Sequence, residues 1–489
     1  MLSPGVRTLL TYLWTLVVIV ATAFSVAPSP SRPIVTAWLT TTDDAAGRHV
    51  VRGLQRQAPI RFTGGATAAG PTIVIRPDRT YQRFVGGGAS LTDTAAWLLN
   101  SSGALAPSTR QGVMTALFDP VDGIGLSFLR NPLGASDLSR YDYSYDSLPP
   151  GQTDPGLDDF SIGHDLPDIV PLTLTAERLD PALTLMMTPW SAPAWMKTND
   201  SRIHDGWLRS RYYPTYAQYF VKTIQAYQAQ GIHVDYVSVQ NEPTCCSHDT
   251  GHPSMDWDGR GLDTFARADL LPAFHAAGID TKLLLLDYNW TDYDDLGSAS
   301  IADPAVTSDP DFGGIAWHGY SGDVATQSSV HNRYPAVPAF DTEHSGGSWV
   351  SDQQRQDMSD IIGFTRNWGT TVTKWSLAVD QNHGPHAGGC ADCTGLVTVH
   401  NGDGRSGAVD YTIEYYDMGQ LTKFVRPGAV RIDSTLTPDV SDVAFRNPDG
   451  STALIAYNGT SHPAPITVID NGASFSYVLP ARTTATFAW

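Results

Sequence analysis

The middle of the chain repeats one pattern eight times: a short apolar run that ends in polar or aromatic residues, and then a longer connecting segment. The runs end at residues 84–88, 126–130, 185–190, 236–242, 283–287, 315–320, 339–343 and 375–380. Continuous apolar runs are typical of strands buried on both faces of a parallel sheet. Connecting segments such as 216–230 and 262–277 carry apolar residues at helical spacing. The pattern predicts an α/β fold, a (β/α)8 TIM barrel.

Both ends of the chain show a different pattern. Apolar and polar residues alternate within 34–40 and 72–75, and short strand-like runs follow Pro427 at 429–432, 443–445, 453–457, 466–469 and 475–479. Turn formers such as those at 447–450 separate these runs. We therefore expect an accompanying all-β sandwich module built from both chain ends. The expected domains are N-terminal sandwich strands at 34–80, a catalytic barrel at 81–425 and a C-terminal sandwich domain at 426–489.

Composition narrows the possible ligands. A chain of 489 residues with 42% hydrophobic residues can form a large barrel and a smaller module. A formal charge of −19 repels phosphate backbones and anionic lipids, so we expect no nucleic-acid partner. The 13 Trp and 20 Tyr residues suit a carbohydrate ligand because aromatic faces stack on sugar rings, although they also serve as core residues. No feature of the sequence specifies an oligomeric state.

The N-terminus resembles a secretory signal peptide. Arg7 precedes an apolar stretch at 9–20, and small residues allow cleavage after Ala23 or Ala27. We expect a signal peptide at 1–27, a secreted, extracellular protein, and no stable membrane insertion after signal removal. The alternative is an uncleaved membrane anchor, because 9–26 is nearly long enough to span a bilayer.

Two glutamates end predicted strands, and catalytic groups of TIM barrels lie at those strand ends. Glu242 ends the fourth run and Glu343 ends the seventh. Hydrolysis of a glycosidic bond requires two carboxyl groups, one to protonate the leaving oxygen and one to attack or to activate water. The fourth and seventh strands face each other across a barrel mouth, so the two side chains can converge on one sugar. In a retaining mechanism the carboxyls would lie about 5–5.5 Å apart.

Several segments, taken together and in order, resemble glycoside hydrolase family 30, the glucosylceramidase-like and endo-β-1,6-glucanase-like retaining β-glycosidases. They are residues 84–93, 123–130, 188–198, 237–243, the pair His318 and Tyr320, and 340–343. The resemblance runs from about residue 34 to the end of the chain. It implies that Glu242 is the general acid/base and Glu343 the nucleophile.

The resemblance also implies a set of substrate-binding residues. Asn241 would bond the sugar 2-hydroxyl, Arg130 would stabilise the nucleophile as a carboxylate, and Asp137 would hold outer hydroxyls of a glucose ring. The remaining members are two tryptophans that contact sugar and two polar residues of the site: Trp190, Trp375, His318 and Tyr320. Each could instead have a structural role, and Asp287, at the end of the fifth run, is equally open to either interpretation.

The four cysteines form two close pairs, Cys245/Cys246 and Cys390/Cys393, and the sequence leaves all three possible pairings open. Two histidines and two cysteines within 383–393 also match zinc-ligand types, but a disulfide-tightened loop is the favoured interpretation for an exported protein. No phosphate loop, nucleotide fingerprint or serine nucleophile elbow is present, so we expect no cofactor and no metal.

The favoured function is a retaining β-glycosidase that cleaves β-glucosidic bonds by double displacement, with a glucosylceramide-type glycolipid or a β-1,6-glucan as substrate. One alternative is the same mechanism on a β-xyloside, a β-fucoside or a β-galactan. A second is a non-catalytic carbohydrate-binding barrel protein, and a third is a zinc hydrolase that uses the 383–393 segment.

Overall fold

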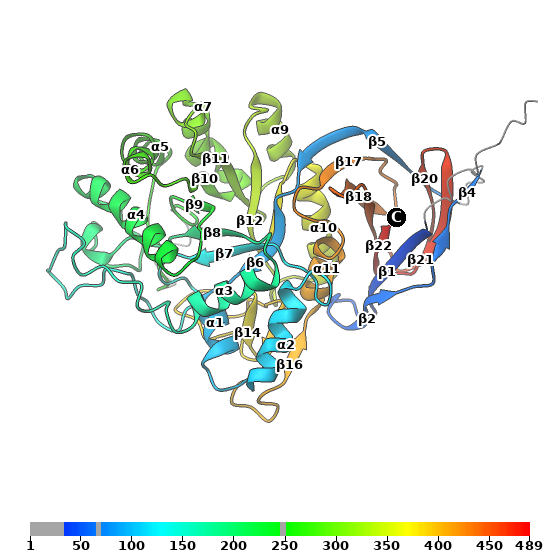
Figure 1. Ribbon diagram of the computed structural model, residues 1–489, viewed down its shortest axis with the longest axis horizontal. Coiled ribbons are helices and arrows are strands. Elements are labelled where there is room, and N and C mark those ends of the chain that lie inside the picture. Colours follow the sequence, from blue (N-terminus) through cyan, green and yellow to red (C-terminus); the bar gives the residue numbers. More distant parts are fainter. Residues whose placement is uncertain (1–33, 65–69, 245–250) are drawn as a thin grey trace, which may run out of the picture.

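The computed structural model describes residues 34–64, 70–244 and 251–489. They form an elongated molecule in which a barrel with surrounding helices lies beside a smaller all-β unit (Figure 1). The expected signal peptide and the pair Cys245/Cys246 lie outside the described residues. No helix in these described ranges combines the length and apolarity needed to cross a bilayer.

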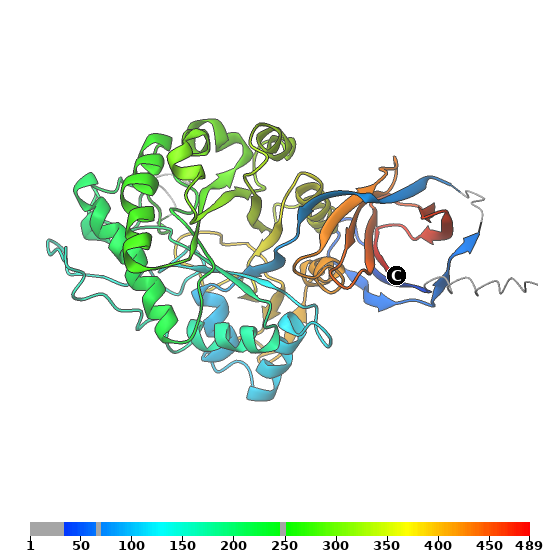
Figure 2. The ribbon, with the colours of Figure 1, turned by 45° about the horizontal axis from the view of Figure 1, so that its top comes forward.

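The barrel is closed by eight parallel strands in chain order, with the last strand pairing with the first (Figure 2). The first strand begins with three glycines, Gly86, Gly87 and Gly88, because it lies too close to the next strand for a side chain. A Cβ at Gly88 would collide with the carbonyl oxygen of Phe128. The prediction of a (β/α)8 barrel is confirmed. The strands are β6 (Gly86–Ser90), β7 (Phe128–Pro132), β8 (Thr184–Thr188), β9 (Tyr236–Ser238), β10 (Lys282–Asn289), β11 (Phe312–His318), β12 (Ala339–Ser345) and β13 (Thr371–Trp375).

Helices cover the outside of the barrel. The segment expected at 216–230 forms α4, and the segment expected at 262–277 forms α5, a five-residue π-helical turn and α6. A three-stranded sheet of β14 (Ala378–Asp380), β15 (Val397–Val399) and β16 (Val409–Tyr411) follows the barrel. The helices are α1 (Asp93–Asn100), α2 (Pro107–Phe118), α3 (Ile169–Leu179), α4 (Tyr213–Ala229), α5 (Gly259–Phe265), α6 (Leu271–Ala277), α7 (Ser298–Ala302), α8 (Pro304–Thr307), α9 (Ala325–Arg333), α10 (Gln353–Arg366) and α11 (Ile413–Thr422).

The all-β unit is a sandwich to which both chain ends contribute, as predicted. The N-terminal strands are β1 (Ile34–Thr42), β2 (Val50–Arg56), β3 (Ile60–Arg61), β4 (Thr63–Gly64) and β5 (Thr72–Arg83). The C-terminal strands are β17 (Val430–Ser434), β18 (Ser441–Arg446), β19 (Thr452–Asn458), β20 (Ala464–Asp470), β21 (Ala473–Leu479) and β22 (Thr483–Ala488). The pairing of β1 with β22, and of β5 with β17 and β20, joins the two sets. Their inner faces form a hydrophobic core separate from that of the barrel.

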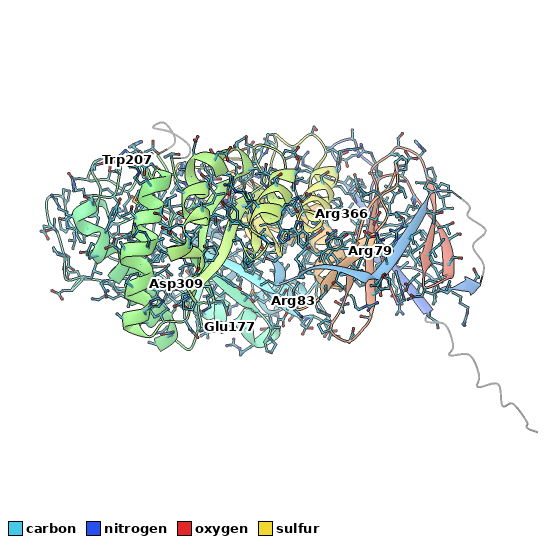
Figure 3. The ribbon with its side chains drawn as sticks, turned by 90° about the horizontal axis from the view of Figure 1, so that it is seen from above. Arg79, Arg83, Glu177, Trp207, Asp309 and Arg366 are labelled. Atoms are coloured by element: carbon cyan, nitrogen blue, oxygen red, sulfur yellow. A yellow bond between two sulfur atoms is a disulfide. The ribbon has the colours of Figure 1, made fainter. Side chains whose placement is uncertain are left out.

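Helix α10 connects the sandwich to the barrel. Arg366, at the end of this helix, donates hydrogen bonds to the carbonyl oxygens of Asp442 (2.8 Å) and Ser434 (3.0 Å), and it lies between the two units in Figure 3. Buried side chains continue this contact, since Gln354 of α10 donates to the carbonyl oxygen of Thr40. The sandwich therefore packs against the outside of the barrel and leaves the barrel mouth open.

Candidate active site

A cleft of about 580 Å³ lies at the carboxyl ends of the barrel strands. Seven of the nine residues predicted for the site line it, and Arg130 and His318 lie buried directly beneath its floor. The lining residues predicted from the sequence are Asp137, Trp190, Asn241, Glu242, Tyr320, Glu343 and Trp375.

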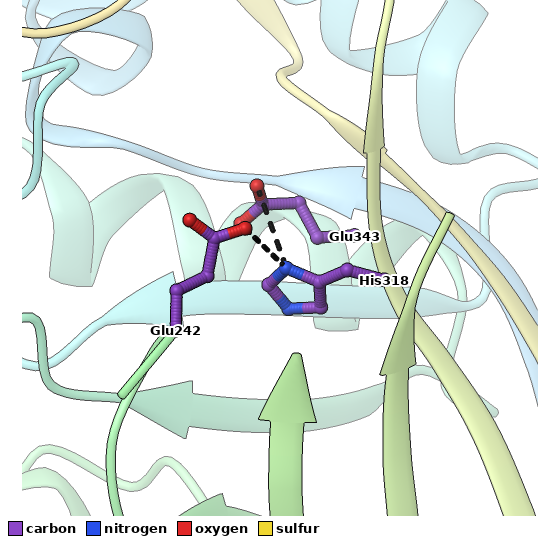
Figure 4. Close-up of side chains that lie close together, drawn as sticks. All are labelled: Glu242, His318 and Glu343. Atoms are coloured by element: carbon purple, nitrogen blue, oxygen red, sulfur yellow. Dashed lines mark hydrogen bonds and ion pairs between the residues drawn. The ribbon is translucent and has the colours of Figure 1, made fainter. Parts of the chain in front are cut away.

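Glu242 and Glu343 meet at this cleft. One carboxylate oxygen of each lies within 4.8 Å of the other and of a ring nitrogen of His318. Nδ1 of His318 lies 2.8 Å from Oε1 of Glu242 and 3.9 Å from Oε1 of Glu343, so the imidazole bridges the two acids (Figure 4). Oxygens within this 4.8 Å limit fit the close pair of carboxyl groups of retaining glycosidases, about 5–5.5 Å apart, better than the ~6.5–9.5 Å of inverting ones.

The backbone at Glu242 departs from a regular strand. Strand β9 ends at Ser238, and Glu242 has a φ of 43°, in the left-handed region that non-glycine residues rarely adopt. Its amide donates to the carbonyl oxygen of Asp287 (3.0 Å), and the amide of Asn241 donates to Pro189 (2.8 Å). The sequence pattern placed Glu242 at the strand end itself. These two bonds, one to a residue of β10 and one to the residue that follows β8, hold the turn that directs the Glu242 side chain into the cleft.

Arg130 holds the base of the site together. Its fully buried guanidinium donates to Oε2 of Glu343 (2.6 Å), Oδ1 of Asn241 (2.7 Å) and Oδ2 of Asp287 (3.1 Å). The guanidinium carbon also lies 5.0 Å from the ring centroid of Trp190. One cation thus orients a carboxylate and an amide, and charge-assisted bonds of this kind are the strongest in proteins.

Asp287 is the anchor beneath Arg130 and His318. It is fully buried and accepts from the hydroxyls of Ser238 (2.5 Å), Thr342 (2.7 Å) and Thr188 (2.8 Å). Nε2 of His318 lies 3.1 Å from its Oδ1. Burial opposes ionisation, but Arg130 and His318 outweigh it and hold the pKa of Asp287 well below its ordinary value. Asp287 is therefore a permanent carboxylate that fixes both cations.

Burial and neighbouring charges shift the pKa values of the groups at the two glutamates. Burial alone would lower the pKa of His318, but the carboxylates of Glu343, Asp287 and Glu242 raise it to about 10, so the ring is an imidazolium. Burial raises the pKa of Glu343, and the charges of His318 and Arg130 oppose that rise. The hydroxyl of Tyr320 donates to Oε1 of Glu343 (2.8 Å), and burial keeps the pKa of this phenol well above 10. Arg130, His318 and Tyr320 thus favour an ionised Glu343.

Asp137 and the tryptophans form one wall of the cleft. Trp190 and Trp375 stack with ring centroids 5.0 Å apart. Burial, followed by the charge of Glu343, raises the pKa of Asp137 to about 7, and its buried Oδ1 has no hydrogen-bond partner. A Cβ at Gly389 would collide with the Asp137 side chain, so the 383–393 loop lies directly against it. A carboxyl group with an unpaired oxygen at a cleft wall can bond a sugar hydroxyl.

A disulfide between Cys390 and Cys393 closes the last part of the 383–393 loop. Both cysteines line the cleft, and Gly347 pairs with Cys393 in an isolated antiparallel bridge. His383 binds backbone, with Nδ1 3.0 Å from the carbonyl oxygen of Cys393. Zinc binding by this segment would require Cys390 and Cys393 as thiolates. The two sulfurs are joined in a disulfide and therefore cannot act as thiolate ligands.

Two groups of residues in the described part of the chain have metal-ligand geometry. The first is the cluster of Glu242, His318 and Glu343 described above. The second is His275 with Asp309 and Asp311, where the ammonium group of Lys282 lies 2.8 Å from Asp311. In both groups a protein cation already neutralises carboxylate charge.

Sequence patterns missed several residues of the cleft. The missed lining residues are His252, Tyr288, Asn289, Ser345 and Trp349. Tyr288 and Asn289 follow Asp287 directly on β10. Their position at the end of the fifth apolar run is the sequence signal that could have identified them as cleft residues. Nothing in the pattern marks Trp349, which lies in the loop after β12.

Comparisons with known proteins agree with this geometry. The model of the glycosyl hydrolase family 30 TIM-barrel domain matches residues 84–399, and that of the family 30 beta sandwich domain matches residues 428–487. An endo-1,6-β-D-glucanase of Aspergillus fumigatus is 33% identical, with 83% of this chain and 85% of the relative covered. Lysosomal acid glucosylceramidase of Mus musculus is 28% identical, with 86% and 84% covered. A solved endo-β1,6-glucanase superimposes with a TM-score of 0.82 at 30% identity and covers 93% of this chain and 98% of its own.

Proposed function

The chain belongs to glycosyl hydrolase family 30, and we propose that it is a retaining endo-β-1,6-glucanase in which Glu343 is the nucleophile and Glu242 the general acid/base. The family membership makes it a glycoside hydrolase that acts on β-glucosidic bonds. The observation that carries the two roles is the approach of the Glu242 and Glu343 carboxylates to within 4.8 Å at the barrel mouth.

The first step forms a glucosyl-enzyme ester. A carboxylate oxygen of Glu343 attacks the anomeric carbon while Glu242 gives its proton to the departing glycosidic oxygen. Arg130 and Tyr320 hold Glu343 by bonds of 2.6 and 2.8 Å, so the attacking oxygen is already oriented. Asn241 has its Oδ1 occupied by Arg130, which leaves its amide N–H groups for the sugar 2-hydroxyl.

The second step hydrolyses the ester. Glu242, now a carboxylate, takes a proton from water as the water attacks the anomeric carbon and Glu343 departs. Esterification removes one negative charge beside His318, whereas the imidazolium and Arg130 remain. Their positive charge then stabilises Glu343 as it leaves as a carboxylate.

The glucan substrate is supported by the relatives. Three fungal proteins named as endo-1,6-β-D-glucanases are 33% identical to this chain, whereas the proteins named as glucosylceramidases are 28–30% identical. Glucosylceramide is the second candidate because the same proposed site would cleave it by the same two steps. The two substrates differ in the group that leaves, and an internal glucosyl unit of the glucan also carries a further glucosyl unit on its 6-oxygen.

We further propose that the protein acts outside the cell. The predicted signal peptide and the Cys390–Cys393 disulfide support this location, because disulfides form and persist in oxidising compartments. Fractionation of cells that express the full chain should find the activity in the medium, and activity retained in the cytosol would contradict export.

Product analysis tests the proposed substrate and mechanism. The protein is incubated with a linear β-1,6-glucan, a β-1,3-glucan, glucosylceramide in detergent micelles, and aryl β-glucoside, β-xyloside and β-fucoside. We expect short β-1,6-linked oligosaccharides as early products, with newly formed ends first detected by NMR in the β-configuration. Early α-configured ends would overturn the retaining mechanism, and release of ceramide without glucan cleavage would favour the second substrate.

A further inference from the structure

Trp349 is a large apolar side chain that remains 51% exposed at the edge of the cleft. Its loop is nevertheless fixed. Arg48 donates to the carbonyl oxygens of Gly347 (2.7 Å) and Val350 (2.6 Å), and Gly347 also pairs with Cys393. A Cβ at Gly347 would collide with the Trp349 ring, so the ring rests directly on that glycine. The loop thus presents an aromatic face, half exposed to solvent, at the edge of the cleft.

A second cavity of about 370 Å³ adjoins the cleft at this tryptophan. Tyr320, Ser345 and Trp349 line both spaces, so the second cavity begins where the cleft ends. Its far wall is the first part of α10 and the residues just before it. These wall residues are Ser351, Asp352, Arg355, Gln356, Ser359 and Asp360.

The polar groups of the second cavity suit an uncharged, hydroxyl-rich ligand. Its cationic and anionic groups already have partners: Arg355 donates to the carbonyl oxygen of Gly459 (2.6 Å), and Asp352 accepts from Arg482 (2.9 Å). His344 lines the same cavity and is only 2% exposed. Its Nδ1 lies 3.2 Å from Oδ2 of Asp341, and its Nε2 has no hydrogen-bond partner. A buried ring nitrogen without a partner is costly unless a ligand completes it.

We propose that the cleft continues across Trp349 into this second cavity, and that the cavity binds a glucosyl unit of the glucan beyond the bond that is cleaved. Trp349 is the aromatic platform between the two spaces, and His344 supplies a hydrogen bond to a sugar hydroxyl. This inference rests on the proposed function and specifies how the enzyme selects a polymeric substrate. An acyl or sphingoid chain would lie against hydroxyl, amide and charged side chains along the same wall and would offer them no hydrogen bond.

The test is the dependence of activity on substrate length. For the whole protein, kcat/KM is measured on an aryl β-glucoside and on β-linked gluco-oligosaccharides of two to six units in β-1,6, β-1,3 and β-1,4 linkage. The Trp349→Ala variant should lower the ratio of kcat/KM on the longest cleaved oligosaccharide to that on the shortest cleaved substrate by ~10-fold, the factor expected for a lost contact of about 1.4 kcal/mol. Ser359→Leu, which narrows the cavity without removing the platform, should lower the same ratio.

The matched control is Trp207→Ala, another tryptophan in a loop, 46% exposed and outside the residues that line either cavity (Figure 3). It should leave the ratio unchanged. If Trp349→Ala and Ser359→Leu also leave it unchanged, the subsite is wrong, whatever linkage is cleaved. A different outcome is a wild type that cleaves only another linkage, with a preference for long chains that both variants lose. In that case the β-1,6 assignment fails and the subsite stands. If the wild type shows no preference for longer chains in any linkage, the subsite is overturned.

Discussion

At the residue scale, the proposed catalytic pair is defined by different neighbours rather than by different side chains. Glu343 accepts hydrogen bonds from Arg130 and Tyr320, which favours its ionised form, whereas Oε1 of Glu242 lies 2.8 Å from Nδ1 of His318. Two identical carboxyl groups can therefore take different roles, because the groups that surround them differ.

Substitution of each glutamate should produce a different kinetic defect. Glu343→Gln should lose at least ~10³-fold in kcat on every glucoside, because no ester can form. Glu242→Gln should lose as much on glucans but far less in the first step on aryl glucosides with good leaving groups, which need no proton. The glucosyl-enzyme should then accumulate in the Glu242 variant, and intact-protein mass spectrometry measures it. Equal loss on both substrate types would contradict the assignment of Glu242 as the acid.

Asp287 should act as a positioning residue whose loss changes a pH profile. Its carboxylate helps to raise the pKa of His318 to about 10, so Asp287→Asn should lower that pKa. The imidazolium would be lost at a lower pH, and the alkaline fall in kcat/KM should move in the same direction. We expect kcat to fall ~10–100-fold with little change in KM.

The matched control for Asp287 is Thr342→Val, which removes one uncharged hydrogen-bond donor, 2.7 Å from the same carboxylate. Thr342→Val should leave the pH of the alkaline fall in kcat/KM unchanged, because no charge is lost. An Asp287→Asn enzyme with low activity and an unmoved alkaline limb would show that Asp287 only maintains the fold.

At the element scale, the barrel could be predicted because its strands are buried on both faces and therefore form uninterrupted apolar runs. Seven of the eight runs became barrel strands in chain order. The eighth, at 375–380, overlaps the last barrel strand only at Trp375, and its residues 378–380 form β14 outside the barrel. Strand β22 was missed because it is rich in threonine, and those threonines are buried through hydrogen bonds rather than apolar contacts. Thr486, for example, donates to the carbonyl oxygen of Gln420 (2.7 Å).

The support beneath the site could be predicted only in part. A strand ending is visible in sequence, but a bulge is not: Leu286 and Asp287 have φ values of 74° and 53°, and the pairing of β10 with β11 shifts there. This local change in backbone direction turns Asp287 toward Arg130 and His318. Trp349 lies in a loop whose position depends on contacts with Arg48 and Cys393, which are distant in sequence and leave no local pattern.

The disulfide loop should control substrate binding through its contact with Asp137. Gly389→Ala would bring a Cβ against the Asp137 side chain, and either the loop or the carboxyl must move. We expect KM for glucosides to rise ~5–20-fold, with a smaller change in kcat, since Asp137 is proposed to hold outer hydroxyls and not the reacting atoms. Steady-state kinetics on an aryl β-glucoside measures this.

Gly404→Ala is the control for the loop, because a Cβ there meets no atom within 4 Å. It should change neither constant. If Gly389→Ala has normal KM, Asp137 does not depend on the loop for its position.

At the scale of the whole molecule, buried acids outnumber buried lysines and arginines among the residues that the structure describes. Lys374 contacts Asp357 (2.8 Å) and Glu414 (2.5 Å), while Asp360, one turn along α10 from Asp357, is bonded by the neutral amide of Gln356. Burial raises the pKa of Asp357 to about 6 and that of Asp360 to about 7. The same cause raises the pKa of Asp165 and of Asp442 to about 6. A protein with a formal charge of −19 thus also stores protons on carboxyl groups inside its fold.

These groups make the free energy of unfolding depend on pH with a defined sign. Between about pH 4 and pH 7 the folded protein holds protons that the unfolded chain, with an ordinary aspartate pKa of 3.8, has already released. Stability must then fall as pH rises through this window. Asp93 and Asp410 act in the opposite direction, because their partners lower their pKa to about 2 and their contribution is lost below about pH 4. We therefore expect greatest stability near pH 4–5 and a steady decline toward pH 8, measured by denaturant unfolding across this range.

Asp165 allows one part of that slope to be isolated. It lies apart from the cleft and accepts hydrogen bonds from the hydroxyls of Tyr145 (2.5 Å), Tyr227 (2.6 Å) and Tyr143 (3.2 Å). Asp165→Asn keeps an acceptor but cannot ionise, so the decline in stability between pH 4 and pH 6 should become shallower by up to one proton. The exposed Asp158→Asn should leave the slope unchanged. A slope unaltered by Asp165→Asn would mean that Asp165 releases its proton in the folded protein as readily as in the unfolded chain, and that its three tyrosine hydroxyls offset the cost of burial.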